Sequence, residues 1–444
     1  MKTRLLLLAA FVCTLRASAA EPDKGFIAHE WGTFTSVQGA DGVQMEWNPL
    51  NVSELPSFVY ERNAVRGKSP RIVVASKTGM SCRQRMETPV IYFYTDRERT
   101  VDVSVNFPQG LITEWYPQES AADVGLRTTA QARLRPQLRW PQVQILAPGK
   151  AEPVLPSDPS GSHYYAARQT DAAFVRVAEK GRKAEVEKFL FYRGTGNFDA
   201  PLTVKLDRTN PKQLTLTNTG AEELRHLFIY EVRDGGGCWL SLKQLKPGET
   251  QTVEVDLAKG ARPFTGADRS LSAGELVNSP RLNTELVDAL VAEGLYRAEA
   301  IAMVKTWEDS WFSENGLRVL YTLSRSWTDR TLPLKVTPAP RETARVMVGR
   351  AEVITPAMEL ALLAQADRYV AAAEADRPKI VEDTRALGLG RFTEATMRRV
   401  CRGIERGPDF SRLSWELLQM ASMKPKPQVT SAAINSEGRA PARP

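Results

Sequence analysis

The chain has 444 residues, of which 42% are hydrophobic, 25% charged and 8% aromatic. With 29 glycines and 28 prolines, a collagen-like or wholly disordered chain is excluded. The formal net charge is +7, and a chain of this length should divide into two or three units, because single apolar cores stop growing at about 250–300 residues.

The first twenty residues have the pattern of a secretory signal peptide. Lys2 and Arg4 precede an apolar run over residues 5–15, and small residues follow. A run of this length is too short to cross a bilayer of about 30 Å as a helix. We expect cleavage near Ala19 or Ala20.

The charge and hydropathy of the remaining chain exclude two classes of partner. Loss of the signal peptide removes three basic residues and no acidic one, which lowers the net charge from +7 to +4. Nucleic-acid binding is therefore not predicted, and no later stretch is apolar for long enough to be an integral membrane span. A lipid-anchored export signal would need a small residue before Cys13, where Val12 stands. We expect a soluble, secreted or periplasmic protein.

Short runs of β-branched and aromatic residues alternate with turn residues from about 68 to 256, which is typical of antiparallel strands. Val101, Val103 and Val105 alternate with polar residues, so one strand face should be buried. Residues 107–110 read as a turn. This pattern predicts a β-sandwich-rich region over residues 21–265.

Residues 135–159 contain six prolines. We expect an exposed linker here, which would divide the β-rich region into two sandwiches.

The spacing of apolar residues changes from strand-like to helical near residue 279. A mixed α/β section is predicted over 266–350. Ser279 and Pro280 start a helix that Gly294 ends, and a strand is expected over 317–323. Between them a second helix carries one apolar stripe, formed by Ala300, Val304, Trp307 and Trp311.

A helical region is predicted over residues 351–421, starting at Thr355-Pro356. Residues 422–444 are rich in proline and lack aromatics, so a disordered tail is expected. The predicted fold class is therefore mainly β, an antiparallel sandwich-like body followed by an α/β section and a small C-terminal all-α region.

Three cysteines remain after signal cleavage: Cys82, Cys238 and Cys401. At most one internal disulfide can form, and Cys82 with Cys238 is the candidate pair because both lie in the strand-rich half. The alternative is three buried thiols. No two cysteines have zinc-ligand spacing.

His29 and Glu30 are the first candidates for chemistry. A zinc protease would need a second histidine at position 33, where the chain has Thr33. Either residue could act as a general acid or base. The alternative is that both hold an N-terminal strand in place.

A second candidate group lies at residues 162–168, which alternate like a strand. It brings His163, Tyr164 and Arg168 close together, a set suited to contact with an anion or a sugar. Arg193 is a further candidate binding residue. The alternative is a half-buried strand with satisfied polar ends. The three histidines show no paired spacing, so neither a metal site nor a cofactor is predicted.

Three stretches resemble segments of a family of large exported bacterial proteins that has no assigned function: residues 29–36 (HEWGTFTS), 107–117 (FPQGLITEWYP) and 316–334. The similarity extends over most of the mature chain. The resemblance implies export, and it brings no catalytic residue, cofactor or substrate.

These observations favour a non-catalytic binding or scaffold role in the cell envelope, with an envelope glycan or protein as the partner. The alternative is an extracytoplasmic hydrolase that acts on envelope or extracellular polymers through carboxylate or histidine chemistry. For such an enzyme His29, Glu30, His163 and Arg193 should converge in one cleft.

Overall fold

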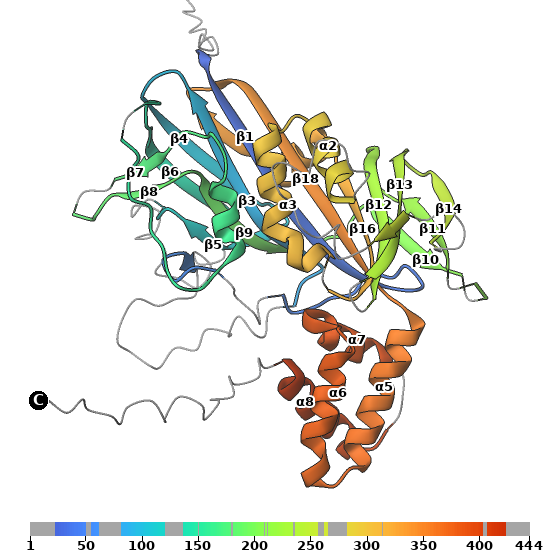
Figure 1. Cartoon of the computed structure of the whole chain (residues 1–444). Helices are drawn as coiled ribbons and strands as arrows, with labels where there is room; N and C mark the ends of the chain where they lie inside the picture. The colour runs from blue at the N-terminus through green and yellow to red at the C-terminus, as the bar shows by residue number, and fades with distance from the viewer. Residues whose placement is uncertain are drawn as a thin grey trace, which may run out of the picture.

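The computed structural model describes most of the chain between residues 23 and 422 (Figure 1). The described residues are 23–49, 55–61, 81–119, 136–149, 151–178, 181–207, 209–210, 212–233, 236–255, 262–264, 282–312, 314–402 and 406–422. The predicted signal peptide at 1–20 and all but the first residue of the predicted tail at 422–444 lie outside them.

A twisted sheet of ten strands forms the centre of the described part of the molecule. The neighbours across this sheet are, in order, β15 (Arg262–Phe264), β13 (Gly236–Leu245), β12 (Leu224–Arg233), β16 (Gly316–Leu323), β18 (Pro340–Ile354), β1 (Asp23–Gly39), β3 (Gln84–Thr95), β9 (Leu190–Gly196), β5 (Gly110–Tyr116) and β2 (Tyr60–Glu61). Every neighbouring pair is antiparallel except β1 and β18, which are parallel.

The segment 29–36 lies in the middle of β1, between β3 and β18. All eight of its residues are buried. This strand has partner strands on both edges and packed layers on both faces, so nearly all of its residues are in the interior. This explains why the segment lacks a regular alternation of apolar and polar residues.

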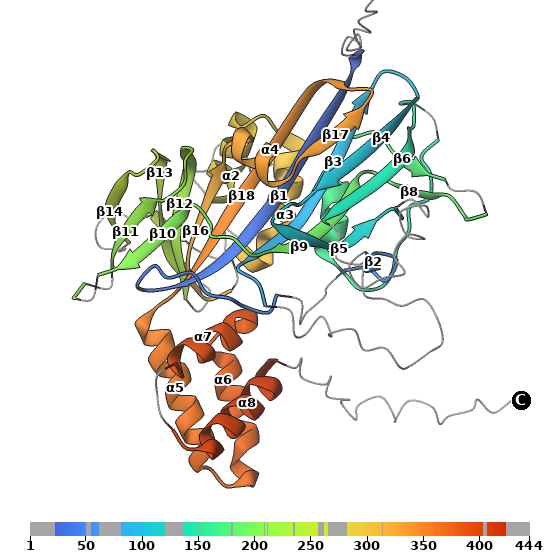
Figure 2. The same cartoon turned by 180° about the vertical axis from the view of Figure 1, so that it is seen from behind.

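Two smaller sheets pack on one face of the central sheet (Figure 2). Val103, Trp140 and Leu216 of these sheets share an apolar core with Ile91 and Ile229 of the central sheet. The five-stranded sheet has the order β17 (Leu334–Thr337), β4 (Arg99–Asn106), β6 (Gln137–Ile145), β7 (Val175–Val177), β8 (Glu185–Glu187), and the three-stranded sheet has the order β10 (Leu202–Leu206), β11 (Gln213–Asn218), β14 (Thr250–Glu254). The short helix α4 (Arg325–Thr331) packs into the same core through Trp327.

Helices cover the opposite face of the central sheet, where α2 (Leu282–Ala292) and α3 (Arg297–Phe312) cross β1 and β18 (Figure 1). The 3₁₀ helix η3 (His163–Arg168) packs beside α3. Leu286 and Met303 bury their side chains against Trp31, Tyr92 and Val348 of the sheet. The two faces of one sheet thus carry two separate cores.

A C-terminal helical module follows β18 directly and lies at one end of the central sheet (Figures 1 and 2). It consists of α5 (Pro356–Ala371), η6 (Glu374–Asp376), α6 (Arg377–Ala386), η7 (Gly390–Phe392), α7 (Thr393–Val400) and α8 (Pro408–Ser422). Thr355 caps α5 by accepting from the Met358 backbone N–H, with Pro356 in the first turn. None of the helices in the described ranges is both long enough and apolar enough to cross a bilayer.

The predicted fold class is confirmed: the chain is mainly β with antiparallel sheets, and its C-terminal region is helical. The Val101–Val105 alternation lies in β4, where the three valines are buried. One sheet, however, runs across the predicted boundaries, because β16 and β18 pair within the same sheet as β1. The predicted start of the helical region at 351 lies inside β18, whose last residue is Ile354.

Two segments differ from their predicted conformation. The proposed linker at 135–159 contains β6, which buries Leu138, Trp140, Val143 and Ile145 against β4. Pro141 is tolerated there because it adjoins a break in the β4–β6 register.

Residues 163–168 form the 3₁₀ helix η3 instead of a strand. Ser162 starts it by accepting a hydrogen bond from the Tyr164 backbone N–H at 3.2 Å. A serine cap of this kind stabilises the first turn of a helix, so this local interaction favours the helix over a strand.

The central sheet leaves no room for a side chain at Gly349. A Cβ atom there would overlap the ring of Tyr321, the residue opposite it on β16. We expect Gly349→Ala to lower the free energy of unfolding by about 1–3 kcal/mol, because the buried ring must move. Urea unfolding measures this, with Gly407→Ala as control because a Cβ there meets open space. Equal stability of the two variants would contradict the packing of β16 against β18.

Candidate functional site

A row of charged side chains crosses six neighbouring strands on the face of the sheet that α2 and α3 cover. Along β16 and β18 the residues facing the helices change from apolar, Leu320 and Val348, to charged, Arg318 and Arg350. The row, named the charged belt from here on, consists of Arg318, Arg350, Glu352, Arg85, Glu87, Arg193 and Glu114 on the strands, with Glu314 at the end of α3 and Arg391 from η7.

Strand register places opposite charges beside each other in this belt. Arg318 lies opposite Glu352 across β16 and β18. Arg193 lies opposite Glu114 across β9 and β5. Cross-strand pairs of opposite charge stabilise a sheet, so the register that the apolar cores require also pairs the charges.

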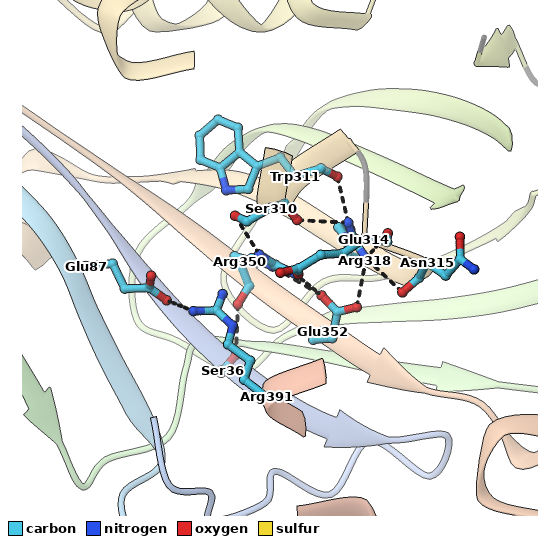
Figure 3. A network of polar contacts seen from close by, with 10 residues as sticks. All are labelled: Ser36, Glu87, Ser310, Trp311, Glu314, Asn315, Arg318, Arg350, Glu352 and Arg391. Atoms are coloured by element: carbon cyan, nitrogen blue, oxygen red, sulfur yellow. Dashed lines mark hydrogen bonds and ion pairs between the residues drawn. The ribbon is translucent and has the colours of Figure 1, made fainter. Parts of the chain in front are cut away.

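Glu352 joins two arginines in one half of the belt (Figure 3). Its Oε2 accepts from Arg350 Nη2 at 2.8 Å, and its Oε1 accepts from Arg318 Nη2 at 3.1 Å. Glu314 adds a second carboxylate to Arg350, at 2.8 Å. Burial alone would raise the pKa of Glu314, but Arg350 and its neighbours hold it below the ordinary value.

Arg318 also closes the end of α3. Its guanidinium donates to the backbone carbonyls of Trp311 at 2.6 Å and Glu314 at 2.7 Å (Figure 3). These carbonyls lie at the C-terminal end of the helix, where a cation is favoured by the helix dipole. The belt therefore fixes both the sheet and the helix that covers it.

Glu87 is the centre of the other half. Its Oε1 accepts from Arg391 Nη1 at 2.8 Å, and its Oε2 lies 3.9 Å from Arg193 Nη2. Burial would raise its pKa, but the charges of Arg391, Arg193 and Arg85 hold it at about 2. Arg85 in turn donates to Glu114 at 3.2 Å.

Arg391 ties the helical module to the sheet. Its guanidinium lies over the rings of Trp47 and Phe392, 5.5 and 5.1 Å from their centroids. Other polar contacts cross the same interface, among them Asn48 with Glu394 at 2.8 Å. The module is therefore held by specific ion contacts as well as by apolar packing.

His29 lies on the helix-covered face of β1, outside the belt. Its Nδ1 is 2.8 Å from Glu299 Oε2 on α3, and both side chains are fully buried. The other Glu299 oxygen accepts from Tyr94 at 2.8 Å. The ring of Tyr296 lies 4.5 Å from the imidazole. This is a histidine held by a carboxylate, the arrangement that orients a general base or a buried structural histidine.

Glu30 points to the opposite face of the sheet. It accepts from Arg345 Nε at 2.6 Å and from the Tyr192 hydroxyl at 2.5 Å. Arg345 also donates to Asp329 at 2.7 Å and to the Leu332 carbonyl at 2.6 Å. The Glu30 carboxylate is thus bound by partners within the core that the central sheet shares with the smaller sheets.

Tyr164 and Arg168 form a cluster of their own around Glu187. The Tyr164 hydroxyl donates to Glu187 at 3.1 Å, and Arg168 binds the same carboxylate through Nε and Nη2 at 2.9 and 2.6 Å. The Arg168 guanidinium lies 4.9 Å from the Tyr165 ring centroid. The planar and aromatic groups proposed for a ligand contact each other instead.

His163 packs against α3 as well, with its ring 6.2 Å from that of Trp307. Trp307 is eight residues beyond Glu299 on the same helix, which corresponds to about 12 Å. The structure therefore does not bring His163 to His29. Of the predicted candidates, only Arg193 belongs to the charged belt.

The predicted disulfide does not form. Cys82 is a buried free thiol that lies 3.2 Å from the Gln84 carbonyl oxygen, and burial raises its pKa to about 12. Cys82 lies just before β3, whereas Cys238 belongs to β13. These two strands are five strand spacings apart in the central sheet, or about 24 Å. Disulfide-bonded Cα atoms lie within about 7 Å of each other.

The described residues offer neither a large hollow nor a cluster of metal ligands as an alternative site. A hollow of about 60 Å³ lies between Gln118, Pro141 and Lys183, whereas small-molecule sites have about 300–1,000 Å³. Within the described residues, no group of three or more histidine, cysteine, aspartate or glutamate side chains is placed to hold a metal ion.

Comparisons with known proteins do not assign the chain. No protein-family model and no curated protein matches it. Among solved structures it is similar to the yeast delta-COP-I mu-homology domain, complexed with the Dsl1 WxWxV peptide (7% identity, TM-score 0.27) and alone (6%, 0.26). Each match covers 74% of this chain and 98% of that one. Similarity at this level carries no argument about this protein.

Sequence reasoning missed the belt, although a signal was present. Arg85-Met86-Glu87 and Arg350-Ala351-Glu352 each place two opposite charges two residues apart within an apolar run. Such residues share one face of a strand. Charges on the buried face of a central strand need partners, so this pattern indicates an ion network.

The low pKa of Glu87 predicts how the stability of the fold depends on pH. Because its pKa falls from the ordinary value near 4.5 to about 2 on folding, Glu87 stabilises the fold above pH 4.5, and this contribution is lost as the pH falls towards 2. We expect Glu87→Gln to lower the free energy of unfolding by about 3 kcal/mol at pH 7, and the difference from wild type to shrink at acidic pH.

Urea unfolding across this pH range is the measurement. Asp199→Asn is the matched control, since Asp199 pairs with Arg83 on the surface and should change stability by less than about 1 kcal/mol. A Glu87→Gln variant as stable as wild type at pH 7 would contradict the role given to this carboxylate.

Proposed function

We propose that the chain is an exported protein of the cell envelope with a non-catalytic binding or scaffold role. Its partner is an envelope glycan or an envelope protein. Export is proposed on the pattern of the first twenty residues.

The observation that carries the proposal is where the side chains of His29 and Glu30 lie and what they bind. They are adjacent in sequence and point to opposite faces of β1, each bound to its own buried partner, Glu299 and Arg345. His163 lies elsewhere along α3. A catalytic site needs its acid, base and substrate contacts on one surface, and these groups instead hold layers of the fold together.

The charged belt supports a binding role. The sheet carries seven of the nine charges, and the belt reaches the surface at the other two, where the side chains of Arg391 in η7 and Glu314 after α3 are 21% and 40% exposed. Ion pairs to buried strand residues hold both groups in place, and charged groups held in this way recognise partners with little loss of conformational freedom on binding.

One observation favours the alternative, a hydrolase of envelope or extracellular polymers. His29 Nε2 is buried and has no hydrogen-bond partner among the described residues, while Nδ1 contacts the Glu299 carboxylate. A histidine oriented in this way by a carboxylate can accept a proton at its other nitrogen.

The two functions are separated by assaying the secreted form for binding and for turnover. It is incubated with purified envelope glycans, with envelope peptides and with simple esters, and products are followed by mass spectrometry. Retention is measured by co-sedimentation with insoluble glycan and on immobilised peptides. We expect retention on one of these materials and no product above the buffer rate.

Four variants complete the experiment. His29→Ala, Glu30→Ala and His163→Ala test the catalytic candidates, and Arg83→Gln, an exposed residue in a surface pair, is the control. Turnover that any of the first three abolishes, with circular dichroism showing a folded variant, would replace the binding role by the hydrolase. Absence of retention on every material would refute the binding role.

A further inference from the structure

Arginines outnumber glutamates among the nine members of the charged belt. Its described members include five arginines and four glutamates, and the half around Glu352 is balanced because Glu314 and Glu352 match Arg318 and Arg350. The excess lies in the other half, where Arg85, Arg193 and Arg391 meet Glu87 and Glu114. A buried guanidinium N–H without an acceptor is costly, so this half favours one more acceptor group.

Arg391 has an edge of its guanidinium free of acceptors. Nη1 donates to Glu87, whereas Nε and Nη2 are buried and have no hydrogen-bond partner among the described residues. The N–H bonds of Nε and Nη2 run parallel along one edge of the group. This edge matches the two oxygens of a carboxylate, which it binds side-on.

Arg193 presents a second unpartnered donor close by. Its Nε is also buried without a partner in the described part of the chain, and its Nη2 lies 3.9 Å from the same Glu87 carboxylate that Arg391 binds. Burial and the neighbouring charge of Arg85 lower the pKa of Arg193 to about 10. An added anion would relieve both the unpaired donor and the repulsion between the guanidinium groups.

The belt meets the surface at Arg391. Its side chain is 21% exposed, against 2% for Arg85. The Arg391 guanidinium lies over the rings of Trp47 and Phe392, and these rings offer no hydrogen-bond acceptor to its Nε and Nη2.

The geometry points to a carboxylate-binding site at the Glu87 end of the charged belt, where Arg391 holds both oxygens of the ligand side-on and Arg193 donates to one of them. The inference rests on the proposed binding function, and it specifies the group of the envelope ligand that the protein recognises.

Acetate is the probe. The secreted form is titrated with sodium acetate, sodium phosphate and sodium chloride at matched ionic strength, and its melting temperature is recorded. In parallel, ¹⁵N spectra of the arginine Nε–H groups are followed. Arg391→Lys keeps the charge and loses the side-on edge. Arg399→Lys is the matched control, since Arg399 lies in the same module and pairs with Glu359 and Asp41 outside the belt.

We expect acetate to raise the melting temperature beyond the effect of chloride, and to shift the Nε–H signal that Arg391→Lys removes. Arg391→Lys should lose most of the acetate effect, and Arg399→Lys should keep it. Should Arg391→Lys not fold, Arg193→Lys makes the same comparison.

Three results would overturn the site: no effect of acetate beyond chloride with no arginine signal moving, an effect of phosphate without one of acetate, or an equal loss in the belt variant and in Arg399→Lys. Failure here leaves retention on envelope material as an independent result. Conversely, acetate binding without such retention would refute the proposed function and leave the site in place.

Discussion

The burial of seven charged side chains along one row of strands is the constraint on which the rest of the described structure depends. Each ion loses several kcal/mol of hydration free energy on burial, which is recovered only when partners and hydrogen bonds surround it. Strand register provides Glu352 for Arg318, and the carbonyls that end α3 provide further acceptors for the same arginine. The helical module provides Arg391 for Glu87. Three layers of the molecule therefore meet at the charged belt, and each contributes contacts to it.

The belt also restricts which fold the chain can adopt. A shift of β18 by one residue against β1 would turn the side chains of Arg350 and Glu352 into the apolar core on the other face of the sheet. Both charges would then lose their hydration without gaining the partners that they have in the belt. Glu87 and Arg391 are 304 residues apart in the chain, so this contact forms only when the sheet and the module are both in place. We infer that the belt contributes to the specificity of the fold, while the apolar cores on the two sheet faces contribute most of its stability.

Local patterns predicted much of the fold, and non-local pairing escaped prediction. The valine alternation of β4, the turn at 107–110 and the start of α5 at Thr355-Pro356 follow from neighbouring residues alone. The parallel pairing of β1 with β18 joins segments over 300 residues apart and has no local signature. Pro136 and Pro141 concealed β6, because prolines at a strand end and at a bulge are compatible with a sheet. At the site, sequence identified Arg193 but not its surroundings, since the neighbours of a buried charge are set by register across six strands.

The central claim is that the belt couples the C-terminal helical module to the sheet through Glu87 and Arg391. A double-mutant cycle measures this coupling directly, with Glu87→Gln, Arg391→Gln and the pair compared by urea unfolding. The account predicts strong non-additivity: the double variant is more stable than the sum of the single effects implies by about 1–3 kcal/mol. Additive effects, within about 0.5 kcal/mol, would contradict it.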